Sequence, residues 1–388
     1  MKTLEIAEQH LDYMVDLRRT LHRHPELSFK EDATSKLVQA ELQKLGIPFV
    51  VVGDHGVVAT IEGTRTDQIV ALRADMDALP IQEDNAHLDY QSAVAGVMHA
   101  CGHDGHVAML LGAARVLLAA RDSLHGTVKL CFQQAEERGG GTKEILEELA
   151  KHPVKSVFGI HLWSEIESGR ISVEAGPRMA AGDRFEIVVR GVGCHGANPD
   201  RGIDPVIAAA AIILNASALI SREVNPVHAT VLTFGKIQGG VAANVIPEQV
   251  ALSGTMRNTN RETRAHLKEA LVRMVTSTAE AYRAKAEIVF SGTGLVVYNE
   301  ARCSEIAASA ARDSAGEAAL IQHPCLMASE NYGEFLEAYP GVFAFVGARN
   351  PDCGACYPHH HPKFNIDEKA MARGAALHAQ YAINFFNS

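Results

Sequence analysis

Three short apolar runs in the first 160 residues each end directly in a cluster of polar side chains. The runs cover residues 69–72, 127–132 and 156–160, and a Leu-, Ala- and Met-rich helical stretch, residues 106–120, lies between the first two. Strands that alternate with helices are typical of a mostly parallel sheet covered by helices on both faces. Such sheets place their binding sites at the carboxyl ends of the strands. We therefore predict an α/β fold whose site lies where these three runs end.

The polar clusters after the runs carry the side chains of a metal site. Asp75 and Asp77 follow the first run, the Glu136-Glu137 pair follows the second, and His161 follows the third. Two further segments are rich in His, residues 98–106 before the predicted helix and residues 357–362 near the end of the chain. Taken alone, a His after a strand or a Glu pair at a helix start is usually an ordinary polar residue. Together, Cys, His and carboxylate groups in one crevice form the ligand set of a borderline divalent metal.

Composition excludes several other classes of protein. Hydrophobic residues at 47% and charged residues at 21% are close to globular averages, and the net charge of −10 gives no surface for nucleic acid. The longest apolar run, residues 206–214, is far shorter than the roughly 20 residues that a membrane span needs. The N-terminus has no signal-peptide pattern, and the seven Cys are an odd, scattered set. We expect a cytoplasmic protein with reduced thiols and no nucleic-acid or membrane partner.

A chain of 388 residues suits two domains of ordinary size. The pattern changes after Gly176-Pro177, where strand-like stretches alternate with two long helical ones, the first opened by an Asp204-Pro205 cap. We predict that residues 181–294 form an inserted, smaller α+β domain. Residues 1–180 and 295–388 then form the catalytic, metal-binding domain, which ends in a helix from Asp367 to about residue 386.

Two other motifs of the sequence carry weaker signals. The pair Cys353 and Cys356 has the spacing of half a zinc knuckle, but the chain holds no second such pair, so a structural zinc there is disfavoured. The run Gly139-Gly140-Gly141 lacks the Lys-Ser/Thr of a phosphate loop and is interpreted as a turn.

Several stretches, in the same order and over nearly the whole chain, resemble the di-metal aminoacylase/carboxypeptidase family of amidohydrolases. The closer resemblance is to its hippurate hydrolase and indole-acetyl-amino-acid hydrolase branch, whose opening is similar to residues 22–26. The stretches that carry the resemblance are residues 73–80, 98–106, 135–137, 159–163, 195–205, 244–247 and 360–362.

The resemblance implies a site with two divalent metal ions, Zn, Mn, Co or Ni, and a general acid/base, Glu136. The implied metal ligands are Cys101, His103, Glu137, His161 and His360. His360 is chosen because the branch carries a His-x-Pro motif, and Pro362 is the proline of that motif in this chain. His359 or His361 is the alternative ligand.

This chain departs from the resemblance at three points. Arg73-Ala74-Asp75 stands where the wider family has His-x-Asp, which agrees with Cys101 as a ligand and leaves Asp75 or Asp77 a supporting role. Gln134 stands where the branch usually has Pro, and Asn331 where it usually has Asp. Neither of these two departures removes a ligand.

The inserted domain contributes by resemblance as well. His195 is similar to the family's oxyanion-stabilising His, and Asn244 and Arg257 lie where the domain would hold a substrate carboxylate. A surface strand Arg is an equally good interpretation of Arg257. The resemblance further implies that this domain is a lid and mediates a homodimer or a higher homo-oligomer.

The function that we expect is metal-dependent hydrolysis of small N-acyl amino acids, hippurate-like or N-acetyl, to a carboxylic acid and a free amino acid. The alternatives within the same chemistry are a biosynthetic N-acetyl amino acid deacetylase and a small-dipeptide hydrolase. From other classes, the alternatives are an inactive metal- or ligand-binding relative and a thiol enzyme with Cys101 as nucleophile. Activity that is lost with a chelator and restored by metal separates the hydrolase from the thiol enzyme.

Overall fold

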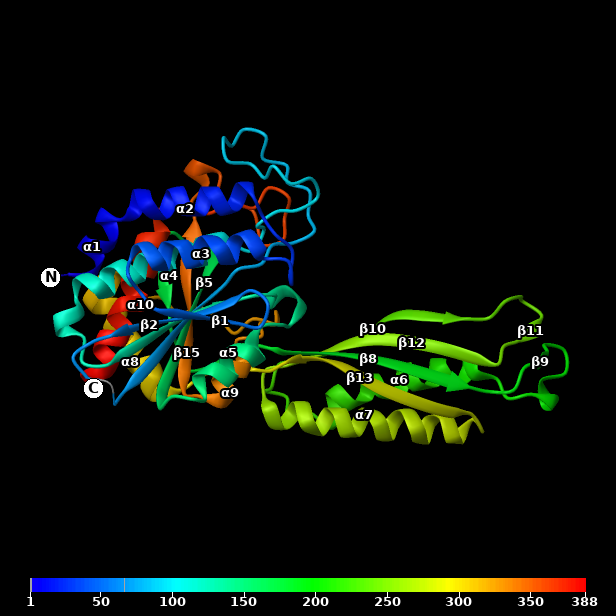
Figure 1. Ribbon diagram of the computed structural model, residues 1–388. Helices are drawn as coiled ribbons and strands as arrows, with labels where there is room; N and C mark the ends of the chain where they lie inside the picture. The colour runs from blue at the N-terminus through cyan, green and yellow to red at the C-terminus, as the bar shows by residue number, and fades with distance from the viewer. Residues whose placement is uncertain (1, 66) are drawn as a thin grey trace. The chain divides into compact units, whose positions relative to one another are not determined.

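The computed structural model describes residues 2–65 and 67–388 and divides into two compact units (Figure 1). The first unit comprises Met1–Arg178, Tyr298–Pro324 and Asn331–Ser388, and the second comprises Met179–Val297 and Cys325–Glu330. No feature of the sequence had marked residues 325–330 as a part of the second unit.

The first unit is built on a seven-stranded sheet in the order β1-β2-β4-β3-β5-β15-β6. Its central strands β4, β3, β5 and β15 are parallel, and β1, β2 and β6 at the edges are antiparallel to their neighbours. This parallel centre confirms the predicted α/β fold. The strands are β1 (Phe49–Val52), β2 (Gly56–Glu62), β3 (Ile69–Asp75), β4 (Thr127–Gln133), β5 (Val154–Glu167), β6 (Ile171–Ser172) and β15 (Gly341–Arg349).

Helices cover the sheet of the first unit and bury its central strands. Along β3, Val70, Leu72 and Ala74 join one core cluster with α4 and α10, while α5 and α9 contact the sheet outside that cluster. Every residue of β3 and β4 is buried as a result. The helices are α1 (Thr3–Gln9), α2 (Leu11–Arg23), α3 (Asp32–Lys44), α4 (His103–Ala119), α5 (Thr142–Leu149), α8 (Ala301–Ala315), α9 (Gly333–Ala338) and α10 (Ala370–Phe386).

Two local features differ from the sequence analysis. Helices α1 to α3 were not predicted, although Met14, Leu17 and Leu21 of α2 are buried at the three- and four-residue spacing of an amphipathic helix. Helix α10 begins at Ala370 and not at Asp367, because the Asp367 side chain accepts a hydrogen bond from the backbone N–H of Lys369 and so lies ahead of the helix.

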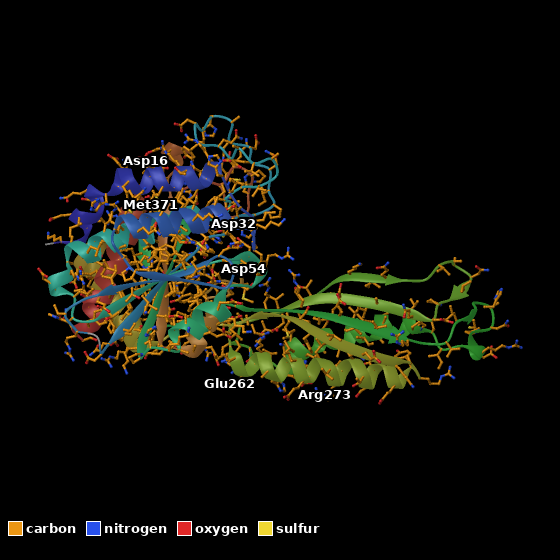
Figure 2. All side chains as sticks on the ribbon, in the orientation of Figure 1. Asp16, Asp32, Asp54, Glu262, Arg273 and Met371 are labelled. Atoms are coloured by element: carbon orange, nitrogen blue, oxygen red, sulfur yellow. The ribbon has the colours of Figure 1, made fainter. Side chains whose placement is uncertain are left out.

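The second unit is a four-stranded antiparallel sheet, β10-β12-β8-β13, that packs against two helices around a core of its own. Asp204 caps α6 by accepting from the N–H of Val206, and Pro205 is the first helical residue, as predicted. Helix α7 buries one side against the sheet and exposes Glu262 and Arg273 on the other (Figure 2). The elements are β8 (Ala181–Arg190), α6 (Pro205–Arg222), β10 (Thr230–Gly239), β12 (Gln249–Asn258), α7 (Arg261–Ala281) and β13 (Lys285–Gly294).

Three smaller features complete the fold. Strands β9 (Cys194–His195) and β11 (Val245–Ile246) form one two-stranded sheet, and β7 (Gly176–Met179) and β14 (Val297–Asn299) form another. Among the described residues, α6 is the one helix that is long and apolar enough for a membrane span on length and composition alone. Its buried face, which includes Ala208, Ile212 and Leu219, belongs to the core of the second unit.

Candidate metal centre

The three polar clusters predicted from the sequence meet at the carboxyl ends of β4, β3 and β5 because these strands are neighbours in the sheet. We call this end of the sheet the edge below. In the register, Asp75 is opposite Gln133 and Arg73 is opposite Gly159, so His161, two residues beyond Gly159, lies level with Asp75. The carboxyl ends of parallel strands thus bring together residues that are far apart in the chain.

Helix α4 begins at this edge and presents His103 as its first residue. Gly102 precedes it with φ of 90°, a left-handed conformation that favours glycine and turns the chain from Cys101 into the helix. Nδ1 of His103 lies 2.9 Å from the backbone oxygen of Asp77 and 3.2 Å from Oδ1 of that residue. These bonds place the ring proton on Nδ1, so Nε2 has its lone pair available as a metal ligand. Nε2 is buried and has no hydrogen-bond partner among the described residues.

Asp77 also fixes the two glutamates. Its Oδ1 accepts from the N–H of Glu136 at 3.1 Å, and its Oδ2 accepts from the N–H of Glu137 at 3.0 Å. The preceding residue, Ala135, has φ of 57°, and the buried Glu31 accepts its N–H at 2.7 Å. The backbone of this turn is therefore held from two sides, and the supporting role expected for Asp75 or Asp77 has a geometric counterpart in Asp77.

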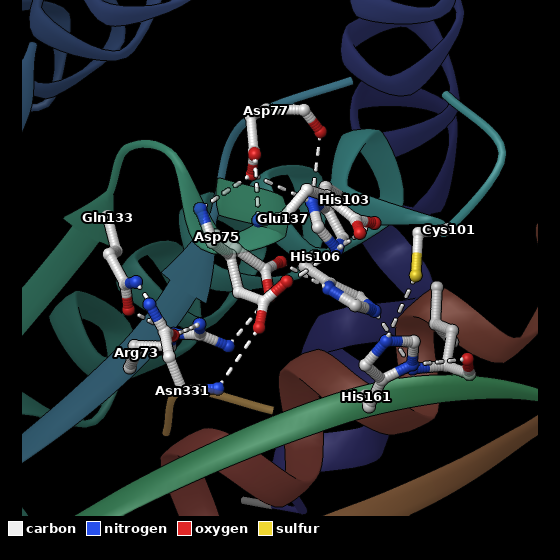
Figure 3. A network of polar contacts seen from close by, with 12 residues as sticks. Arg73, Asp75, Asp77, Cys101, His103, His106, Gln133, Glu137, His161 and Asn331 are labelled. Carbon is white, nitrogen blue, oxygen red and sulfur yellow. Dashed lines mark hydrogen bonds and ion pairs between the residues drawn. The ribbon is translucent and has the colours of Figure 1, made fainter. Parts of the chain in front are cut away.

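Six side chains supply ligand atoms in three overlapping groups at the carboxyl ends of these strands. Figure 3 shows Cys101, His103, Glu137 and His161 among them. Within each group, all the ligand atoms lie within 4.8 Å of one another. Cys101 belongs to two of the groups, and Glu136 joins a third. The groups are Cys101, His103 and His161; Cys101, Glu137 and His360; and His103, Glu136 and Glu137.

The donor atoms fit divalent metal ions. Oε1 of Glu137 is buried without a hydrogen-bond partner, and it lies 3.4 Å from Nε2 of His360 and 4.0 Å from Nε2 of His103. Nδ1 of His161 lies 2.7 Å from the backbone oxygen of Leu162, which directs its Nε2 to within 3.5 Å of the Cys101 sulfur. Unpaired buried donors that converge on one point, of the types that Zn and similar ions prefer, indicate a cation site.

The geometry also separates the three consecutive histidines of the C-terminal motif. Both ring nitrogens of His359 are engaged, Nδ1 by Ser164 at 3.0 Å and Nε2 by the oxygen of Leu162 at 3.0 Å. Nδ1 of His361 accepts from Lys363, and the ring stacks on Tyr357. Of the three, His360 is the one whose ring nitrogen lies in a metal-binding group.

A fourth cluster, Asp75, His103 and His106, has ligand spacing but a different arrangement of hydrogen bonds. Nε2 of His106 accepts from the N–H of Leu162 at 2.9 Å, so its Nδ1–H donates to Asp75 at 2.6 Å. Asp75 is in turn paired with Arg73 at 2.6 Å. His106 therefore has both nitrogens occupied and braces the edge.

The protonation states of two predicted ligands follow from their surroundings. Burial, reinforced by the nearby His106 ring, lowers the pKa of His161 well below its usual value, so this ring is neutral as a ligand must be. Burial and the charge of Glu137 raise the pKa of the Cys101 thiol well above its usual value. A raised pKa opposes the thiolate that a nucleophilic Cys101 requires, whereas a bound cation would favour deprotonation.

Residues predicted on the inserted domain occupy two ends of the second unit. His195 and Asn244 are exposed neighbours on the β9–β11 pair, where Gly196 donates to the backbone oxygen of Asn244 at 2.8 Å. Arg257 lies near the end of β12 and donates from Nη1 to Ser329 at 2.6 Å. The structure does not bring Arg257 together with His195.

Two residues that shape the centre had no functional prediction. Asn331 was noted only as a departure, yet its backbone N–H donates to Glu136 at 3.1 Å. Glu31 lies in a segment for which the sequence analysis makes no prediction, directly before helix α3. No metal-binding group within residues 2–65 and 67–388 includes Cys353 or Cys356, and both are exposed, free thiols.

Comparisons with known proteins identify the family of the chain. The model of peptidase family M20/M25/M40 matches residues 71–384. The IAA-amino acid hydrolase ILR1-like 2 of Arabidopsis thaliana is 40% identical over 392 residues, covering 99% of this chain and 88% of that protein. The N-acetyl-L-cysteine deacetylase of Bacillus subtilis is 38% identical over 365 residues, covering 93% and 85%. The Bacillus subtilis YXEP protein, a dinuclear metal-binding peptidase from the M20 family, superposes with a TM-score of 0.86 at 34% identity, covering 98% and 99%.

These matches confirm the resemblance inferred from the motifs, and they extend over nearly all of the chain. The chain belongs to peptidase family M20/M25/M40 and is a metal-dependent amidohydrolase.

Proposed function

We propose that the protein hydrolyses the amide bond of small N-acyl amino acids with two divalent metal ions held by Cys101, His103, Glu137, His161 and His360. The observation that carries the proposal is the pair of overlapping ligand groups that share Cys101, with Glu136 beside them. His161 and His360 belong to different groups that share Cys101, an arrangement that suits two adjacent ions. When bound, such ions supply Lewis acidity that activates water and polarises the amide carbonyl.

Glu136 is the proton carrier in this proposal. Its backbone is fixed by Asp77 and one carboxylate oxygen accepts the N–H of Asn331, so the side chain is aimed rather than mobile. Glu137, the next residue, turns its own carboxylate towards His360. Glu136 takes the proton of the attacking water and delivers it to the departing amine, a transfer that typically contributes about 10² to 10⁴ in rate.

His195 stabilises the oxyanion that forms on the carbonyl oxygen when water attacks the carbonyl carbon. Its Nδ1 accepts from the N–H of Ala197 at 3.0 Å, so the proton of the neutral ring is on Nε2, which is exposed and can donate. A well-placed donor of this kind contributes about 3 kcal/mol to transition-state binding. We assign the substrate carboxylate to Asn244 or, at the other end of the second unit, to Arg257, whose guanidinium can pair with both oxygens of a carboxylate.

The substrates are amino acids with a hippurate-like aroyl group or an acetyl group. One matched relative is named an IAA-amino acid hydrolase and another an N-acetyl-L-cysteine deacetylase, and these names support amino acid conjugates as the class of substrate. A biosynthetic deacetylase and a small-dipeptide hydrolase are the alternatives within this chemistry. We further propose that the metal is Zn, Mn, Co or Ni, that the second unit acts as a lid and mediates a homodimer, and that the enzyme works in the cytoplasm, in keeping with its free cysteines.

The test is metal analysis together with a panel of N-acyl amino acids, read by release of free amine. Activity should disappear with a chelator and return with Zn²⁺, Mn²⁺, Co²⁺ or Ni²⁺. A protein that binds metal but turns over no member of the panel is the inactive relative. Activity that survives chelation and is lost on alkylation belongs to the thiol enzyme.

Glu136→Gln should keep the metal content of the wild type and lose about 10² to 10⁴ in kcat, because the amide cannot accept the proton. Glu147→Gln, on the exposed side of α5, is the matched control and should retain full activity. Near-native turnover by Glu136→Gln would remove Glu136 from the mechanism.

A further inference from the structure

Asn331 is a buried side chain that holds both ends of the glutamate turn. It is 5% exposed, and its Nδ2 donates to the backbone oxygen of Gly140 at 3.0 Å. Its backbone N–H donates to Oε1 of Glu136 at 3.1 Å. The turn between these two contacts is closed by the N–H of Gly140, which donates to the backbone oxygen of Ala135 at 2.8 Å. One residue therefore contacts the turn at the Glu136 carboxylate and again at its exit.

The orientation of Asn331 is fixed by residues on the neighbouring strands (Figure 3). Its Oδ1 accepts from Nε2 of Gln133 at 2.9 Å and from Nη2 of Arg73 at 3.3 Å. Gln133 and Arg73 are bonded to each other at 2.9 Å, and Arg73 is paired with Asp75. Because both the oxygen and the nitrogen of the amide are bonded, the side chain is held in one orientation. The anchored side chain keeps the residue in place, and its backbone N–H bonds Glu136 from that position.

The amide of Asn331 supplies a donor and an acceptor at once. Its Nδ2 is one of two donors to the Gly140 oxygen, the other being Nε2 of Gln133 at 2.9 Å. Its Oδ1 is an acceptor for Gln133 and Arg73. Alanine would remove all three of these side-chain bonds, although Gln133 would still donate to Gly140.

We propose that Asn331 is a positioning residue that holds the Glu136 carboxylate in place for proton transfer, an inference that rests on the proposed role of Glu136. Asn331 touches neither metal nor substrate in this account and acts through Glu136 alone. A displacement of about 1 Å at a catalytic group can cost about 10² in rate, so the effect should appear in kcat.

The experiment compares Asn331→Ala with the wild type for kcat, KM and metal content. We expect kcat to fall about 10- to 100-fold, with KM changed less than about threefold and the metal content unchanged. Asn299→Ala is the matched control, since Asn299 is equally buried, donates to Glu174 and Phe343, and has no contact with the turn. It should lose stability like Asn331→Ala but keep kcat within about twofold of the wild type.

A double-mutant cycle with Glu136→Gln separates positioning from general support of the fold. Where the carboxylate is already absent, adding Asn331→Ala should lower the residual rate less than about threefold, because there is nothing left to position. If the two losses multiply, Asn331 does not act through Glu136 and the inference is overturned. A folded Asn331→Ala protein with kcat within twofold of the wild type overturns it as well.

Asn331→Leu, which keeps a side chain of similar size but has neither donor nor acceptor, keeps the inference testable if the alanine variant does not fold, and its kcat should also fall by at least about fivefold. An unchanged kcat in that variant would count against the inference. Failure of the proposed function itself is recognised separately, since the wild type would then turn over no member of the panel or would keep its activity in the presence of a chelator.

Discussion

Replacement of His378 should change how the stability of the enzyme depends on pH. His378 lies on α10, is 1% exposed, and packs edge-on against Phe158. Burial, with a smaller contribution from the charge of His106, lowers its pKa from the usual 6.5 to about 3. The folded protein therefore keeps this ring neutral at a pH where the unfolded chain already binds a proton.

The sign and size of the effect follow from this difference. Above pH 6.5 neither state is protonated and His378 adds no pH dependence. Below pH 6.5 the unfolded state gains a proton that the folded state does not, so the free energy of unfolding falls as the pH falls, until the pH approaches 3. The slope for one proton is about 1.4 kcal/mol per pH unit, which gives a loss of about 2 kcal/mol between pH 6.5 and pH 5.

His378→Leu removes the titrating group while keeping an apolar side chain of similar size. The assay is urea unfolding of the metal-free protein at pH 7.5, 6.5, 5.5 and 5. The variant should lose about 2 kcal/mol less than the wild type between pH 6.5 and pH 5. Leu377→Ala, also fully buried on α10, is the control and should lower stability by the same amount at every pH. If the His378→Leu and wild-type curves run parallel over this range, burial of a neutral His378 is refuted.

Two stability predictions concern the packing of helices α2 and α4. Arg18→Met should cost about 3 to 5 kcal/mol in denaturant unfolding, because it removes one partner of a buried ion pair. Arg18 bonds the fully buried Asp104 at 2.8 Å, and without it that carboxylate keeps His22 but loses the guanidinium. A loss below about 1 kcal/mol would contradict this. Gly112→Ala should cost about 1 to 3 kcal/mol, because a Cβ there would overlap the sulfur of Met14, and an unchanged unfolding midpoint would show that Met14 can move aside.

The central sheet could be predicted because its strands are apolar on both faces and end abruptly in polar residues. The runs that end near Leu72, Phe132 and Ile160 lie within β3, β4 and β5, and the rule for parallel strands placed their ends together. Helices α1 to α3 were not predicted. Arg18 and His22 interrupt the apolar pattern of α2, because residues of these types are usually exposed to solvent. In the fold both are buried and bond to Asp104.

The ligand residues were predicted by motif, but the bonds that aim them could not be. The pairing of Asn331 with Glu136 joins residues 195 positions apart, and that of Glu31 with Ala135 joins residues 104 apart. Nothing local in the sequence indicates that a backbone N–H will meet a given carboxylate, because the contact depends on the finished fold. The same holds for His359, whose two ring partners, Ser164 and Leu162, lie on β5.

Residues 325–330 return to the second unit after the chain has left it at Val297. Met179 forms a bridge with Leu326, and Arg257 bonds Ser329, so these late residues supply partners to early ones. During synthesis the second unit consequently stays unfinished until residue 330 has left the ribosome, although most of its length emerged long before. A fusion of residues 179–297 to another protein would likewise lack residues 325–330, and Met179 and Arg257 would lose their partners Leu326 and Ser329.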